Sequence, residues 1–392
     1  MVHAKTAPYR SQFVVGLITT FLLAVNVGAT QVVQVGPLRA IKSIADAAKR
    51  AVDGDVVEVD AGDYVGDVAV WSQKNLKLRA VAGRVRLLAN GLSAEGKAIW
   101  VIRNAQMTVE GFDFLNARVP DRNGAGIRFE SGRLTVRNCS FQNNEMGLLT
   151  SNNPDAELVV ENSEFAHNSR PDGHNHNLYV GRIARLTVSG SYFHHGATGH
   201  LLKSRAAQNH VMYNRLTDEP GGHASYELEF PDGGVAYVIG NIIGQSAQTE
   251  NSTLISFGAE GYKWPANELY LINNTLIDET RFGGTFLRVK SGAGVVKGIN
   301  NLLVGSASLE RASPGEFHNN VNVGSDLFER GLMGDFRLKS DSRRLARAID
   351  PGRANDRALR PHSEYAHPRG VRALDAPADN LGALQRTVRS TP

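Results

Sequence analysis

The sequence predicts an all-β solenoid, and two features of its 392 residues carry this prediction. From about residue 99, a short apolar alternation is followed by Asn or Gly, two further residues and a closing apolar residue. The closing residues recur 23 to 33 positions apart, and they are Phe141, Phe165, Phe193, Leu216, Ile243, Leu276 and Leu303. Each repeat holds about three short strand-like runs and no helical pattern. This combination favours a right-handed parallel β-helix with one coil per repeat.

The residues before the repeat predict an N-terminal capping helix. Residues 37–52 carry apolar side chains at helical spacing, with Pro37 suited to a helix start and Gly54 to its end. Residues 55–64 then alternate apolar and polar side chains, as a strand does. We therefore expect one helix to cover the open end of the first coil.

An asparagine recurs near the second turn of most coils. The members of this row are Asn138, Asn162, Asn214, Asn241, Asn274 and Asn301. Stacked amides can satisfy one another and the backbone of the turn. We interpret the row as a stabilising ladder and assign it no function.

The first 29 residues resemble a secretory signal. Lys5 and Arg10 precede a short apolar run, which ends at small residues before Thr30. We expect this segment, residues 1–29, to be removed. The mature chain is then secreted or periplasmic, with no stable membrane insertion.

The remaining chain divides into residues 30–335, which we assign to the β-helix, and residues 336–392, a tail packed on it. Cys139 is the single cysteine, so no internal disulfide is expected, and its parity with Phe141 predicts a buried thiol. A formal net charge of +4 gives no signal for a nucleic-acid partner.

The candidate site lies in residues 174–230, where three strand-like runs recur every 24 residues. Tyr179, Lys203 and Glu227 share this spacing, and alternation along a strand places them on one outer face. The row predicted to face inward is Leu178, Leu202 and Tyr226. We predict that the outer row lines a binding surface.

Other candidates surround this row. Arg205 and Glu229 have the same spacing, and His176 is expected to stack on His200. Further predicted substrate contacts are Asn177, His174, His195, Tyr262 and Trp264. The two aromatic residues of the last pair either stack on a sugar ring or cover the edge of the solenoid, and both interpretations stay open.

Three segments carry a resemblance to a known family. They are AIKSIADAAKRAVDGDVVEVDAGDY (40–64), MGDFRLKSDSRRLARAIDPG (333–352) and DNLGALQ (379–385). Together with the repeat, the chain resembles the pectate-lyase-like superfamily, over nearly all of its mature length. The resemblance implies a polysaccharide in a groove along the first sheet, but the superfamily includes lyases, hydrolases, uronan epimerases and noncatalytic adhesins. The arginine motif of pectate-type lyases is absent, and Arg-Pro-Asp-Gly-His174 only faintly resembles the epimerase motif Asp-Pro-His-Asp.

The predicted chemistry is β-elimination on a uronic-acid polymer by a polysaccharide lyase. This reaction needs a base, a cation that neutralises the carboxylate, and an acid for the leaving oxygen. Lys203 or a histidine is the candidate base, Arg205 the neutraliser, and Tyr179 or another histidine the acid. A carboxylate beside Lys203 favours its ammonium form. A histidine base, His176 or His200, avoids that conflict.

Several alternatives remain open. Lys203–Glu227 and Arg205–Glu229 can be ion pairs that only hold two coils in register. Glu227 and Glu229, about 7 Å apart on one strand, can instead serve an inverting glycoside hydrolase. A uronan epimerase and a noncatalytic glycan-binding protein are the other classes.

We predict no obligatory metal and no other cofactor. Acidic side chains between residues 172 and 232 offer oxygen ligands to Ca²⁺, and paired histidines offer nitrogen ligands to Zn²⁺. No run has the spacing of a calcium loop or a zinc motif. The expected partner is therefore an acidic polysaccharide alone.

Overall fold

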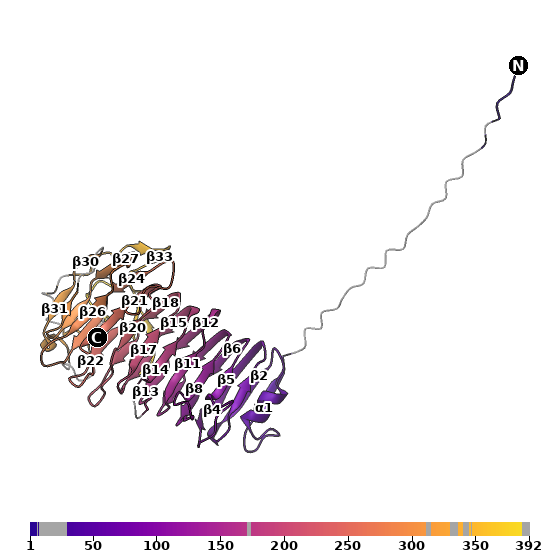
Figure 1. Ribbon diagram of the computed structural model, residues 1–392, viewed down its shortest axis with the longest axis horizontal. Coiled ribbons are helices and arrows are strands. Elements are labelled where there is room, and N and C mark those ends of the chain that lie inside the picture. The colour runs from indigo at the N-terminus through magenta and orange to yellow at the C-terminus, as the bar shows by residue number, and fades with distance from the viewer. Residues whose placement is uncertain are drawn as a thin grey trace, which may run out of the picture.

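A computed structural model describes residues 1–5, 7, 30–170, 174–310, 315–329, 336–339, 345 and 347–385. In these residues the chain winds into an elongated solenoid whose strands run parallel from coil to coil (Figure 1). The predicted parallel β-helix is confirmed. Most of the predicted signal, residues 1–29, lies outside the described residues, so its removal stays a prediction.

Each coil contributes one strand to each of three faces. The first sheet contains β3 (Ala69–Trp71), β5 (Ala98–Ile102), β8 (Ala125–Phe129), β11 (Met146–Thr150), β14 (His176–Val180), β17 (His200–Ser204), β20 (Leu228–Phe230), β23 (Thr253–Phe257), β26 (Thr285–Val289) and β29 (Ser308–Leu309). The second face contains β6 (Ala105–Glu110), β9 (Gly132–Arg137), β12 (Asn153–Glu161), β15 (Ile183–Ser189), β18 (Gln208–Met212), β21 (Val235–Ile239), β24 (Glu268–Ile272), β27 (Val295–Ile299) and β30 (Glu316–His318). The third face contains β7 (Phe112–Leu115), β10 (Ser140–Gln142), β13 (Glu164–Ala166), β16 (Tyr192–His194), β19 (Arg215–Thr217), β22 (Ile242–Gln245), β25 (Thr275–Asp278), β28 (Leu302–Val304) and β31 (Val321–Val323).

The first coils join the second and third faces into one sheet. Here β1 (Val32–Val35) pairs with β2 (Val56–Val65), and β2 pairs with the long strand β4 (Asn75–Leu88). Because β4 pairs with both β6 and β7, the two faces begin as one continuous ribbon.

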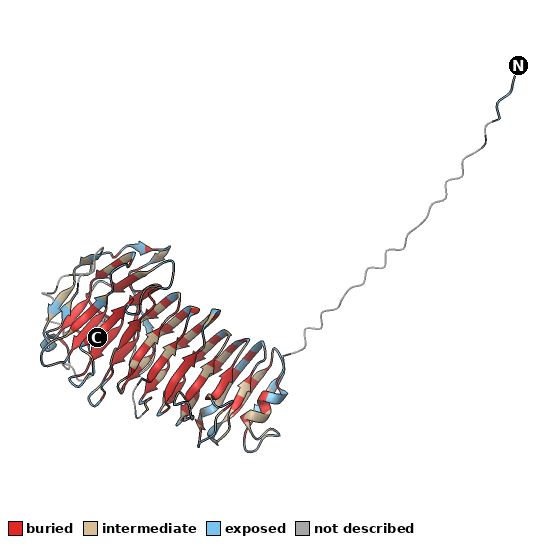
Figure 2. Ribbon diagram, in the orientation of Figure 1, coloured by how far each residue is buried: buried red, intermediate tan, exposed pale blue. Residues whose placement is uncertain are grey.

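Buried residues recur on the strands along the length of the solenoid (Figure 2). Inside it, aromatic side chains stack in a column from coil to coil. Phe114, Phe141, Phe165 and Phe193 are fully buried, with successive ring centroids 4.9, 4.6 and 4.8 Å apart. This spacing equals the ~4.8 Å between adjacent strands, so each ring stacks on its counterpart in the next coil. Cys139 is buried beside this column, as predicted, and burial raises the pKa of its thiol to about 11.

The asparagine ladder forms, but its membership differs from the prediction. Side chains of Asn214, Asn241, Asn274, Asn301 and Asn320 hydrogen-bond in sequence, with Nδ2 to Oδ1 distances of 2.8–3.1 Å. In the preceding coils the same position holds Ser163 and Ser191. The placement of Asn138 and Asn162 in the ladder is therefore wrong. Both lie one residue earlier, at a left-handed turn with φ of 49°, where Asn is favoured for its conformation.

The capping helix α1 (Ile44–Arg50) contacts β1 and β3 at the N-terminal end of the solenoid (Figure 1). It begins later than Pro37 because Ser43 provides the N-cap and accepts a hydrogen bond from the Asp46 amide. Asp67 accepts from the next two free amides, those of Ile44 and Ala45. The helix buries Ile44, Ala47 and Ala48 against the first coil.

The described C-terminal residues lie along the middle and later coils. Leu381 and Tyr365 pack on Ile242, Ile277 and Leu302 of the third face. The segment contains η1 (Ser325–Leu327), β32 (Arg353–Ala354), β33 (Arg357–Ala358), β34 (Ser363–Tyr365) and β35 (Val371–Ala373). Across the described ranges, no helix combines the length and apolar character that a membrane crossing requires.

Candidate functional site

Three neighbouring strands of the first sheet, β14, β17 and β20, carry the candidate site. Tyr179 pairs with Lys203 and His176 with His200, as predicted. Lys203 pairs with Glu229, however, so the prediction that Glu227 is its neighbour is wrong. The interval changes from 24 to 26 because the irregular segment before β20 is longer than the preceding connection.

The simple alternation of faces also fails in these strands. At least two consecutive residues are buried in or directly before each strand, including Asn177 and Leu178, Leu201 and Leu202, and Glu227 and Leu228. The rings of the flanking residues instead form one continuous stack. Centroid distances are 5.3 Å from Tyr179 to His176, 4.6 Å from His176 to His200 and 5.1 Å from His200 to Tyr226. Tyr226 therefore joins the histidines, and its predicted inward position is wrong.

Lys203 and Arg205 form the cationic centre of the site. The Lys203 ammonium lies 2.9 Å from Glu229 and 3.1 Å from Glu260. Arg205 contacts Asp232 at 2.6 Å and Glu260 at 2.8 Å. The exposed fractions of the two cationic side chains are only 11% and 14%, so these pairs are shielded more than ordinary surface pairs.

Arg205 also donates through Nε to the phenol oxygen of Tyr179, at 3.0 Å. Burial acts to lower the pKa of Arg205, but its bonds to Tyr179 and Glu260 and the charge of Asp232 outweigh burial and raise it. The guanidinium therefore stays charged and stabilises negative charge on the Tyr179 oxygen.

Glu260 reaches the site from a loop that follows β23. Its carboxylate bridges Lys203 and Arg205, although its side chain is 47% exposed. The Trp264 indole donates to the Arg205 carbonyl at 3.0 Å, and the Tyr262 hydroxyl donates to the Lys290 carbonyl at 2.5 Å. Both aromatic residues therefore fasten the loop over the edge of the solenoid, which favours the covering interpretation over sugar stacking.

Hydrogen-bond geometry assigns the protons of the two stacked histidines. The backbone amide of His200 donates to Nδ1 of His176 at 3.0 Å, so that nitrogen is an acceptor. His200 Nδ1 lies 2.8 Å from the same atom and must be the donor. The free lone pair of His200 is consequently on Nε2, which lies 3.4 Å from Glu229.

Both imidazoles are held neutral. Burial lowers the pKa of His200 to about 3, with a further contribution from Lys203 and Arg205. Burial and the neighbouring His200 lower the pKa of His176 well below its usual value. The pKa of Glu229 shifts in the opposite direction, because burial raises it more than Lys203 lowers it.

Glu227 does not belong to this surface. Its side chain is fully buried and neither carboxylate oxygen has a hydrogen-bond partner. Burial raises its pKa strongly, with further contributions from Asp218 and Asp278. The predicted ion pair Lys203–Glu227 and the paired carboxylates Glu227 and Glu229 are both wrong, because only Glu229 reaches the outer face.

The other predicted contacts separate into three places. Asn177 is buried, and its amide bonds to Asn168 and to the carbonyl of His194, which leaves it unavailable to substrate. His174 is exposed at the edge of the site. His195 lies with His167 and His194 in a separate cluster at the turn after the third face.

Sequence reasoning missed Glu260 and Arg182, and it considered Asp232 only as a possible oxygen ligand for Ca²⁺. Arg182 lies 2.6 Å from Asp232, which also binds Arg205. None of the three falls in the repeating rows, because each lies in a connection outside the strands. Only the packing of those connections brings them to the cationic centre.

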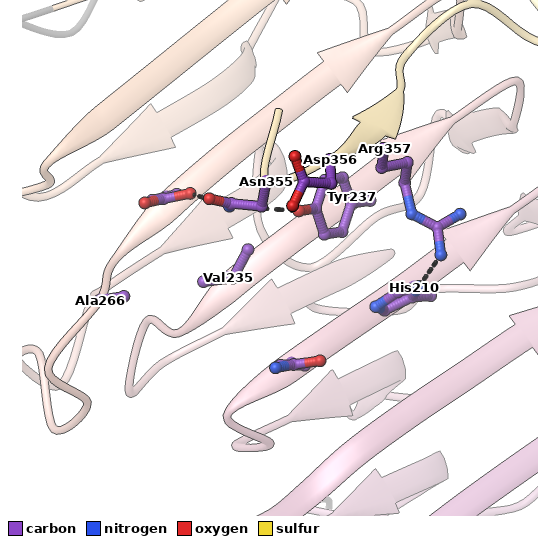
Figure 3. Close-up of a pocket in the computed structure, with 9 residues that line it drawn as sticks. His210, Val235, Tyr237, Ala266, Asn355, Asp356 and Arg357 are labelled. Carbon is purple, nitrogen blue, oxygen red and sulfur yellow. Dashed lines mark hydrogen bonds between the residues drawn. The ribbon is translucent and has the colours of Figure 1, made fainter. Parts of the chain in front are cut away.

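A separate pocket of about 540 Å³ lies on the second face (Figure 3). There Arg357 contacts His210 at 3.0 Å, and Asn355 donates to Glu268 at 2.7 Å. These contacts join the C-terminal segment to the solenoid wall. The pocket contains none of the residues that surround Lys203.

Comparison with known proteins agrees with the fold. Residues 83–238 match the family model for a right handed beta helix region. The crystal structure of pectate lyase Pel9A aligns with a TM-score of 0.62 over 92% of this chain and 98% of that chain, at 12% sequence identity. No curated protein matched the sequence. The chain thus has the right-handed parallel β-helix fold predicted from its repeats, and this fold is similar to that of a pectate lyase. Its chemistry must be argued from the site.

Proposed function

We propose that this protein is a polysaccharide lyase that cleaves an acidic, uronic-acid-containing polymer by β-elimination. The observation that carries the proposal is a carboxylate-binding pair, Lys203 and Arg205, beside a neutral histidine with an available lone pair. The similarity of the fold to a pectate lyase supports a polysaccharide substrate. The proposal also includes export of the protein and activity without an added cofactor.

Glu260 indicates how the substrate carboxylate binds. Its carboxylate bridges the two cations from an exposed position on a loop. A uronate carboxylate has the same charge and geometry and can replace it. Bound there, its negative charge is neutralised, which makes the neighbouring C5 proton more acidic.

His200 and Tyr179 complete the reaction. His200 Nε2 takes the C5 proton, the electron pair of that C–H bond forms the C4–C5 double bond, and the C4–O bond breaks. Tyr179 gives its proton to the leaving oxygen, and Arg205 stabilises the phenolate that remains. The low pKa of His200 keeps its imidazole neutral in the free protein, so Nε2 carries no proton, but it also makes His200 a weak base.

The test is the ultraviolet absorbance of unsaturated product over a panel of uronans. We expect absorbance with at least one uronan, and a loss of ~10²–10⁴ in rate for His200→Ala. Lys203→Ala should lose turnover in the same way. Arg288→Ala is the matched control, because Arg288 lies in the same row as Lys203 and Glu229, two coils beyond Glu229.

The outcomes are distinct. New reducing ends without unsaturation would mark hydrolysis, and uronan binding without cleavage would mark a glycan-binding protein; either result refutes elimination. Epimerisation of intact polymer would refute it as well. If Lys203 only holds the coils together, Lys203→Ala should lower stability by more than the ~1 kcal/mol of an exposed ion pair, because the buried Glu229 loses its partner, and should leave turnover intact.

A further inference from the structure

Three histidines meet at the turn between the third face and the first sheet. One ring nitrogen from each of His167, His194 and His195 lies within 4.8 Å of the other two. The rings of His167 and His195 are stacked, with centroids 4.4 Å apart, and His194 is nearly perpendicular to both. The three nitrogens therefore converge from two adjacent coils.

Glu164 assigns the tautomer of His194. Its carboxylate lies 3.2 Å from His194 Nε2. The Nε2–H therefore donates to a carboxylate. The lone pair of His194 then lies on Nδ1, which faces His195 Nδ1 at only 2.6 Å.

The backbone supplies an independent observation. His167 and His195 have φ of 55° and 46°, in the left-handed region. The preceding coils hold Asn143 and Asn116 at the equivalent turn, with φ of 55° and 66°. Asn is the common residue for this conformation. The two coils nearest the candidate site therefore replace an ordinary turn residue with an imidazole.

We propose that His167, His194 and His195 form a binding site for a divalent transition metal of the Zn²⁺ class. Three converging imidazole nitrogens suit such an ion, whereas Ca²⁺ requires oxygen ligands. A carboxylate behind a liganding imidazole, as Glu164 lies behind His194, is the usual outer partner of such a site. Tetrahedral Zn–N bonds of ~2.0–2.1 Å separate two nitrogens by about 3.3 Å. The shortest contact must then open by roughly 0.7 Å, within the reach of small ring rotations.

The place of the site gives it a role beyond the proposed cleavage. His167 precedes the connection to β14, which carries His176 and Tyr179, and His195 precedes the connection to β17, which carries His200. An ion held by both turns would fasten these two connections to each other. The metal site thus stabilises the coils under the candidate active site, and it does not depend on what those coils bind or cleave.

The test is calorimetric titration of Zn²⁺ into the full, untagged chain after treatment with a chelator. We expect one site per chain, a rise in melting temperature with Zn²⁺, and the visible absorption of tetrahedral Co²⁺ on substitution. His167→Asn and His195→Asn keep a residue suited to the left-handed turn. Each should weaken Zn²⁺ by at least about 100-fold, because loss of an outer partner alone costs ~10–100-fold. Glu164→Gln should fall within that smaller range.

His174→Asn is the matched control, because His174 has φ of 60° and lies outside the cluster. It should bind Zn²⁺ as the unaltered chain does. Absence of saturable Zn²⁺ binding would overturn the proposal, as would equal affinity in a folded His167→Asn or His195→Asn variant. Circular dichroism establishes that each variant is folded, and either one suffices if the other fails to fold.

Discussion

Replacement of Glu227 by Gln should make the protein less sensitive to rising pH. Glu227 is fully buried, and neither of its carboxylate oxygens has a hydrogen-bond partner. Burial raises its pKa, and Asp218 and Asp278 raise it further. The folded protein therefore keeps Glu227 neutral, whereas the unfolded chain ionises it near pH 4.3.

The sign follows from proton linkage. A carboxyl whose folded pKa is raised contributes its full stability below about pH 4.3 and loses it as the pH rises toward the folded pKa. The loss approaches about 1.4 kcal/mol per pH unit for one proton. Between pH 5 and pH 7, the original chain should lose up to about 2.7 kcal/mol relative to Glu227→Gln, because Gln carries no titrating proton.

The assay is the free energy of unfolding in urea for both proteins at pH 5, 6 and 7. The difference between them should grow with pH in favour of Glu227→Gln. Glu250→Gln, at an exposed position, is the control and should give a difference that does not change with pH. Parallel profiles for Glu227→Gln would refute the reasoning, since they would mean that Glu227 ionises as readily in the folded protein as in the unfolded chain.

Three further predictions concern the ladder and the site. Asn241→Ala should lower stability by at least about 2 kcal/mol in calorimetry, because two buried backbone groups each lose a partner worth ~1–3 kcal/mol. Asn162→Ala, outside the ladder, should lower stability by about half as much, and equal losses of stability would contradict the ladder. Glu260→Gln should lower KM for a uronan with kcat nearly unchanged, and a higher KM would contradict displacement by substrate. Tyr179→Phe should keep the melting temperature and lose ~10²–10⁴ in turnover, so normal turnover would exclude Tyr179 as the acid.

The interior column of the β-helix was predictable because the sequence pattern that encodes it is short and repeats in every coil. Every coil returns an apolar residue to the same interior position, so Phe141, Phe165 and Phe193 recur at intervals set by the circumference of the coil. The same regularity predicted the pairing of Tyr179 with Lys203. It failed for Asn138 and Asn162, because a left-handed turn and an adjacent ladder position both favour Asn.

The chain by itself therefore determined the solenoid, its capping helix and the coils that carry the cations and histidines. Only the tertiary structure decided which carboxylates meet those cations. Glu229 replaces Glu227 because the connection before β20 shifts the register, and each strand buries two consecutive residues. Glu260 reaches Lys203 and Arg205 from a loop more than 50 residues away. Periodicity encodes the strands, whose positions repeat, but it carries no information on connections, whose conformations depend on what they pack against.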